Sequence, residues 1–149
     1  MSTILVVDDD KATREGVART LKSDYMVLTA ADADAAMAAL NVNSVDLVLT
    51  DLRMPGRDGL SLLRDIIVAY PGIPVILLSA YGSVESAVEA MKDGAYDFLT
   101  KPINLDHLEL VVRRALKQKH LERQNANLRT QLVGHLHIQV HQHHGYGSC

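Results

Sequence analysis

The 149-residue sequence has one cysteine, no tryptophan and no long hydrophobic run. The cysteine is Cys149, the last residue, so no disulfide can form within the chain, and we expect a reducing, cytoplasmic location. The residues after Met1 predict neither a signal peptide nor a membrane span. The net charge of −3 lacks the basic excess of a nucleic-acid-binding chain, so we expect no direct nucleic-acid contact.

Hydrophobic residues make up 48% of the chain, and the length suits one packed domain. Five short apolar runs predict strands at Ile4–Val7, Tyr25–Thr29, Asp46–Leu49, Pro74–Leu78 and Tyr96–Leu99. Segments with helical spacing lie at Thr13–Leu21, Ala33–Leu40, Leu60–Ala69, Val84–Met91 and from about Asn104 onward. Most of the apolar runs do not alternate, which is typical of strands buried on both faces. This order predicts an α/β fold, a doubly wound five-stranded parallel sheet with helices on both faces.

Beyond about residue 120 the pattern changes. We predict one domain over residues 1–120 and a linker helix over 121–133, in which Leu121, Asn125, Leu128 and Leu132 follow a heptad spacing. This spacing favours a coiled coil with a second copy as much as a solvated single helix. Residues 134–149 hold five of the seven histidines in no structural zinc pattern. We interpret them as a remnant of an expression vector, with a metal-binding tail as the alternative.

Polar residues stand where four of the predicted strands end. Asp8 and Asp9 follow the first strand, Asp51 ends the third, Ser79 ends the fourth and Lys101 follows the fifth. Ligands of open parallel sheets bind beyond the carboxyl ends of the strands, at a point where the strand order reverses. The sequence therefore predicts a site at this edge.

Three carboxylates at one edge would repel each other, and Lys101 would neutralise only one negative charge. A few carboxylates with room for water suit Mg²⁺ better than Ca²⁺. A carboxylate nucleophile, Mg²⁺ and a lysine are also the groups that phosphoryl transfer requires. Taken singly, such residues are more often solvated charges or helix caps, and we expect Asp10 to cap the first helix. Their joint placement at the strand ends favours a functional site.

Four segments, Leu5–Asp10, Leu49–Pro55, Leu78–Ala80 and Phe98–Pro102, resemble the receiver domains of response regulators. The resemblance covers roughly residues 3–118, and the motifs are highly specific in combination. It implies a flavodoxin-like receiver fold of strand order 2-1-3-4-5, here with an extended C-terminal helix.

The resemblance also implies a role for each site residue. Asp51 would accept a phosphoryl group, and Mg²⁺ would bind Asp8, Asp9, Asp51 and the backbone carbonyl of Arg53. Lys101 would pair with the phosphoryl oxygens, and the switch pair Ser79 and Phe98 would move with them. Phosphorylation would thus give Ser79 and Lys101 a partner that they lack in the free state. The Lys101–Pro102 bond would be cis, and Arg53 and Tyr81 occupy positions that tune hydrolysis.

The run from Ser79 to Pro102 resembles receivers of the nitrogen-regulator type, which control sigma-54-dependent transcription activators. The resemblance implies a two-component system with a sensor histidine kinase as phosphodonor. It also implies a homodimer, through the fourth helix, fifth strand and fifth helix or through the linker helix. The sequence has no Gly-x-x-x-x-Gly-Lys-Ser/Thr motif, so we expect the ATPase and DNA-binding output domains elsewhere in a longer protein. Such a domain phosphorylates itself and slowly loses the group, but is not a turnover enzyme.

Three other functions fit the sequence less well. A haloacid-dehalogenase-type phosphatase would place its nucleophile in Asp-x-Asp after the first strand, where this chain has Asp8-Asp9-Asp10. A flavodoxin-like cofactor binder would need phosphate-binding Ser, Thr or Gly at that point, and acidic residues would repel a phosphate. A receiver-like module that has lost phosphorylation would not need the complete set of Asp8, Asp9, Asp51, Ser79 and Lys101.

Overall fold

The computed structural model describes residues 1–54, 56, 58–80 and 84–131, with side chains as far as residue 122. The strands are β1 (Thr3–Val7), β2 (Met26–Ala30), β3 (Leu47–Asp51), β4 (Val75–Ser79) and β5 (Asp97–Thr100). The helices are α1 (Lys11–Leu21), α2 (Ala33–Val42), α3 (Gly59–Ala69), α4 (Val84–Lys92) and α5 (Leu105–Gln131). Each predicted element is present, with ends that differ by only a few residues.

The chain divides into two compact units, Met1–Leu116 and Lys117–Cys149. The division of the sequence at residues 120 and 133 stays a prediction. Part of the predicted heptad pattern lies outside the described residues, because Leu132 does, and so does the histidine-rich tail. In the described part of the chain, no helix combines the length and the apolar character that a bilayer crossing requires.

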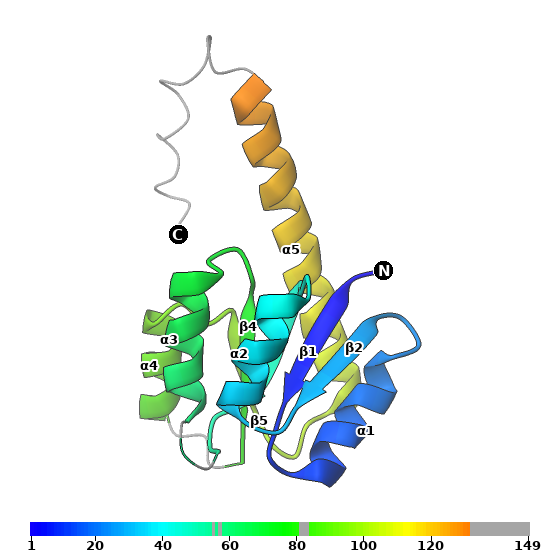
Figure 1. Ribbon diagram of the computed structural model, residues 1–149, viewed down its shortest axis with the longest axis vertical. Helices are drawn as coiled ribbons and strands as arrows, with labels where there is room; N and C mark the ends of the chain where they lie inside the picture. The colour runs from blue at the N-terminus through cyan, green and yellow to red at the C-terminus, as the bar shows by residue number, and fades with distance from the viewer. Residues whose placement is uncertain (55, 57, 81–83, 132–149) are drawn as a thin grey trace. The chain divides into compact units, whose positions relative to one another are not determined.

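The five strands form one parallel sheet in the order β2-β1-β3-β4-β5, as predicted (Figure 1). The register decides which residues meet at its carboxyl edge. Val7 of β1 pairs with Thr50 of β3, so the next residues, Asp8 and Asp51, stand level with each other. The strand order reverses between β1 and β3, so these two acids flank the switch point of the sheet.

Two apolar cores cover the two faces of the sheet, because alternate strand residues point to opposite sides. Leu5 and Val7 pack with residues of α2, α3 and α4, whereas Ile4 and Val6 pack with residues of α1 and α5 (Figure 1). The prediction of burial on both faces holds for β3 and β4, every residue of which is buried, and nearly so for β1. The edge strands β2 and β5 are less buried, and Met26 of β2 is 55% exposed.

Aspartate side chains cap the N-termini of three of the helices, α1, α2 and α3. Asp10, Asp32 and Asp58 each accept a hydrogen bond from the backbone N–H three residues later, so each satisfies a donor that the helix leaves open. The prediction that Asp10 caps the first helix is confirmed. Gly94, just after α4, has a φ of 105°, the left-handed conformation with which many helices end.

Gly59, the first residue of α3, lies against the backbone that carries Asp51. Its N–H donates to the carbonyl of Leu52 at 2.6 Å. A Cβ at this position would lie 2.3 Å from the Asp51 carbonyl oxygen and 2.8 Å from the Leu52 Cα. Only glycine therefore lets α3 begin directly beneath the end of β3.

We expect Gly59→Ala to lower the free energy of unfolding by about 1–3 kcal/mol, because backbone rather than a flexible side chain must move. Gly16→Ala is the matched control, since no atom lies within 4 Å of its added Cβ in the middle of α1. That control should gain about 0.5–1 kcal/mol from better helix propensity. Urea unfolding of both variants measures the difference, and equal effects would show that the close approach at Gly59 is unimportant.

Candidate functional site

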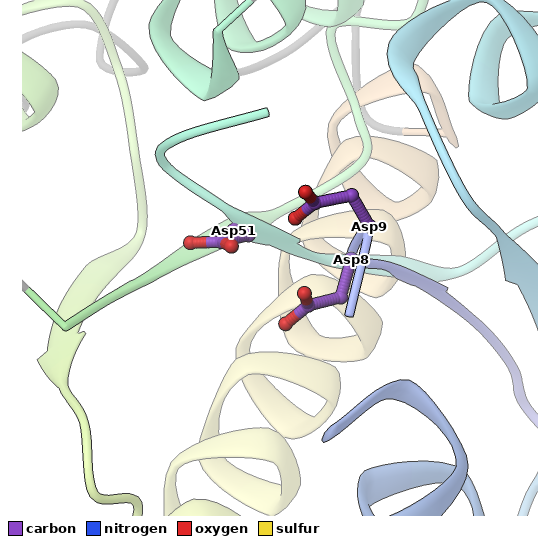
Figure 2. Close-up of side chains that lie close together, drawn as sticks. All are labelled: Asp8, Asp9 and Asp51. Carbon is purple, nitrogen blue, oxygen red and sulfur yellow. The ribbon is translucent and has the colours of Figure 1, made fainter. Parts of the chain in front are cut away.

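The acidic cluster comes from two neighbouring strands. Asp8 and Asp9 lie in the loop after β1, and Asp51 is the last residue of β3. Each of the three offers a carboxylate oxygen, and these oxygens all lie within 4.8 Å of one another. Figure 2 shows the three side chains extending toward the same side of the strand ends. Asp8 and Asp51 are buried, with 1% and 8% of their surfaces exposed, while Asp9 is exposed.

Lys101 neutralises part of this charge. Its Nζ donates to Asp8 Oδ2 at 2.9 Å and lies 3.4 Å from Asp51 Oδ2. The backbone N–H of Lys101 also donates to the Ser79 carbonyl at 2.8 Å, which ties the loop after β5 to the end of β4. The lysine, which follows β5, therefore reaches acids that lie two strands away, at β3, and three strands away, at β1.

Lys101 and Ser79 both have protein partners before any phosphorylation. Lys101 pairs with two carboxylates, as expected from its predicted role of neutralising part of the acidic charge. Ser79 is 1% exposed and is not without a partner either. An incoming anion would have to compete with these existing contacts.

Burial and charge together raise the pKa of the Asp51 carboxyl. Burial is the largest cause, and the negative charge of Asp8 adds to it, while Lys101 opposes both. For Lys101, burial alone would lower the pKa, but the hydrogen bond and charge of Asp8, with the charge of Asp51, outweigh it and raise the pKa. The lysine is therefore held positive, yet its single charge does not fully compensate the acids.

These residues fit a hard divalent cation. Oxygen ligands from three clustered carboxylates are the type that Mg²⁺ and Ca²⁺ prefer, and the exposed Asp9 keeps one side open to water. Burial is the main cause of the raised pKa of Asp51 and the charge of Asp8 adds to it, so a bound divalent cation would favour the ionised carboxylate.

Three of the remaining predicted site residues, Ser79, Arg53 and Phe98, lie in the described part of the chain. Ser79 ends β4 beside β3. The backbone N–H of Arg53 lies 3.4 Å from Asp51 Oδ1, whereas the ligand role of its carbonyl stays a prediction. Phe98 in β5 is half-buried and packs against the core on the side of α2, α3 and α4. Tyr81 lies outside the described residues. The Lys101–Pro102 bond is cis, as predicted.

The sequence reasoning missed Arg14. This residue lies in the first turns of α1, and its Nη1 donates to the backbone carbonyl of Asp8 at 2.7 Å. The only signal available was an arginine at the start of a helix, four residues after Asp10. Sequence alone gives no sign that a side chain binds a carbonyl, because every residue has one.

Comparison with known proteins agrees with this geometry. Residues 4–113 match the response regulator receiver domain family. The C4-dicarboxylate transport transcriptional regulatory protein DctD of Rhizobium meliloti is 38% identical over 85% of this chain and 28% of its own length.

Two solved structures of Brucella abortus NtrX are also similar. The crystal structure of NtrX in complex with ADP has a TM-score of 0.82 and 43% identity over 87% of this chain and 30% of that one. The separate NtrX receiver domain has a TM-score of 0.73 and 44% identity over 76% of this chain and 98% of that one. The chain thus spans less than a third of the longer relatives that it matches. On the family match and these identities, the chain belongs to the response regulator receiver domain family and is a receiver domain of a two-component system.

Proposed function

We propose that this domain accepts a phosphoryl group on Asp51 from a sensor histidine kinase, in a reaction that depends on Mg²⁺. The observation that carries the proposal is the convergence of Asp8, Asp9, Asp51 and Lys101 at one strand edge of a receiver fold. Asp51 is the natural acceptor, because its carboxylate lies within 4.8 Å of those of the other two acids and its Oδ2 is 3.4 Å from the Lys101 Nζ.

The transfer requires position and charge neutralisation more than covalent help from the protein. A carboxylate oxygen of Asp51 forms a bond to phosphorus as the bond from phosphorus to the kinase histidine nitrogen breaks. That histidine keeps the electron pair of the broken bond. The low exposure of Asp51 keeps competing water away from most of the carboxylate.

Asp8, Asp9, Asp51 and the Arg53 carbonyl would hold the metal ion. When bound, Mg²⁺ supplies positive charge for the acids and for the phosphoryl oxygens. Lys101 supports the same charge from the other side, since its Nζ is 3.4 Å from an oxygen of Asp51. Its contact with Asp8 would have to lengthen as it turns to the phosphoryl group.

Phosphorylation would then act as a switch. It adds a charge of about −1.5 to −2 and three strong acceptors at Asp51. Ser79 and Lys101 would exchange their present partners for the phosphoryl oxygens, and Phe98, now half-buried, would move further inward. The surface formed by α4, β5 and α5 would change with them.

We further propose that this surface, or the linker helix, forms a homodimer that controls output domains in a longer cytoplasmic protein. Support comes from the apolar side chains of Val84, Val88 and Met91, which are 80%, 47% and 48% exposed on α4. Their spacing places them along one side of the helix. The output domains would be the ATPase and DNA-binding parts of a sigma-54-dependent activator.

We expect Asp51→Asn to abolish phosphorylation, because the amide cannot replace the carboxylate nucleophile. Intact mass would show one added phosphoryl group on the native chain with Mg²⁺ and acetyl phosphate, and none without Mg²⁺. Asp24→Asn, at an exposed turn after α1, is the matched control and should be phosphorylated like the native chain. If neither acetyl phosphate nor beryllofluoride modifies the native chain, the domain is a phosphorylation-independent module.

Asp51→Asn should also raise the stability of the metal-free protein near pH 7. The folded state raises the pKa of Asp51, so its ionisation weakens folding as pH rises from the unfolded value of about 3.9 through the higher folded value. Removing the charge removes this loss, and each kcal/mol recovered adds about 4 °C to the melting temperature. Below about pH 4 the advantage should disappear.

Thermal unfolding over pH measures this effect, with Asp24→Asn again as control. Saturating Mg²⁺ should reduce the difference between native and variant, because the ion stabilises the ionised native cluster. A variant less stable than the native chain at pH 7 without metal would contradict the proposed shortage of positive charge.

Val88→Glu should weaken dimerisation of the beryllofluoride-treated protein by about tenfold or more, because it buries an unpaired charge in an apolar contact. Val68→Glu is the matched control, since Val68 is 83% exposed on α3, outside the proposed surface. Sedimentation equilibrium would measure both. Equal dimer affinity in the two variants would remove α4 from the dimer interface.

A further inference from the structure

The loop that carries Asp8 and Asp9 is held at several points. The Asp8 N–H donates to the Ala30 carbonyl of β2 at 3.1 Å. The Asp8 carboxylate accepts from the Asp10 N–H at 2.9 Å and from Lys101 at 2.9 Å. The Asp8 carbonyl accepts from Arg14 at 2.7 Å. Every polar group of Asp8 is therefore engaged, each by a different segment of the chain.

The Asp9 side chain is held differently from its two neighbours in the cluster. Asp8 and Asp51 both have their carboxylates fixed by Lys101. Among the residues that the structure describes, the exposed Asp9 carboxylate takes part in no hydrogen bond or ion pair. Its position within 4.8 Å of the other two acids therefore depends on where the backbone places its Cα.

Arg14 fixes that backbone. The peptide bond between Asp8 and Asp9 is planar, so anchoring the Asp8 carbonyl oxygen fixes the plane that leads to the Asp9 Cα. The anchor is a short, charge-assisted hydrogen bond from the guanidinium, which is stronger than a bond between neutral groups. Because Arg14 is itself in a regular helix, its hydrogen bond ties the loop of Asp8 and Asp9 to the fixed backbone of α1.

Arg14 also brings a positive charge to this segment. No carboxylate partner of Arg14 is found among the described residues, so its charge is directed at the peptide group that joins two of the acids. Lys101 approaches the cluster from the carboxylate side, and Arg14 approaches it from the backbone side.

We infer that Arg14 is a positioning residue that holds the Asp9 carboxylate in place for the divalent cation of the acceptor site. The inference rests on the proposed function for the role of the cation, but the positioning itself is a property of the metal-free protein. Arg14 does not touch the metal or the phosphoryl group, and acts through the Asp8–Asp9 peptide group.

The test compares Arg14→Met, which keeps an apolar stem but removes charge and donors, with Arg14→Lys, which keeps both in part. Arg19→Met is the control, because Arg19 is exposed later in the same helix, away from the loop. Titration with Mg²⁺ alone, followed by amide chemical shifts, should show about tenfold weaker binding in Arg14→Met. Arg14→Lys should return to within about threefold of native affinity, and Arg19→Met should match the native chain.

A second measurement separates this inference from the proposed function. Hydrogen exchange at the Asp10 amide, in metal-free protein, should be about tenfold faster in Arg14→Met, while exchange in β3 follows global stability alone. If the native chain binds no Mg²⁺, the proposed function fails, and the exchange rate at Asp10 alone then tests the role of Arg14. The inference is overturned if Arg14→Met binds Mg²⁺ within twofold of the native affinity. Where no Mg²⁺ binds, it is overturned if exchange at Asp10 is the same in Arg14→Met as in the native chain.

Discussion

The structure depends on the cost of holding three carboxylates together at the end of a buried sheet. Asp8, Asp9 and Asp51 have oxygens within 4.8 Å of one another, and Lys101 provides one positive charge against them. Burial first, and then the charge of Asp8, raise the pKa of Asp51 although Lys101 opposes both. This arrangement does not favour stability, because a buried polar group whose charge is not fully neutralised weakens the folded state. The arrangement is suited to binding a cation.

The parallel sheet forces the carboxylates of Asp8 and Asp51 close together. Because Val7 pairs with Thr50, the residues that follow, Asp8 and Asp51, are brought level at the ends of the two strands that flank the switch point. Gly59 then brings the start of α3 against the Asp51 backbone, at a distance that no Cβ would permit. The strands and α3 together leave the Asp51 carboxylate little freedom to move away from Asp8.

Much of this could be predicted from the sequence, because strand ends and motif residues are local features. The elements, the strand order and the meeting of Asp8, Asp9, Asp51 and Lys101 were all expected. Features that depend on which surface another element covers could not be predicted in this way. The exposure of Met26 follows from the edge position of β2. Arg14 was missed because its acceptor is a carbonyl, which every residue has.

A charge change at Asp51 can alter a distant surface only if one element near it is weakly anchored. The five helices differ in this respect. α3 buries five residues, from Gly59 to Ile66, whereas the described residues of α4 include one, Ala90. Among the described residues, the exposed Arg64 of α3 contacts Glu89 of α4 at 2.9 Å and Asp93, just after α4, at 2.8 Å. Exposed ion pairs contribute little to stability and are screened by salt. In the proposed switch, α4 is therefore the helix that can shift at small cost, while α3 and the sheet keep the acceptor site in place.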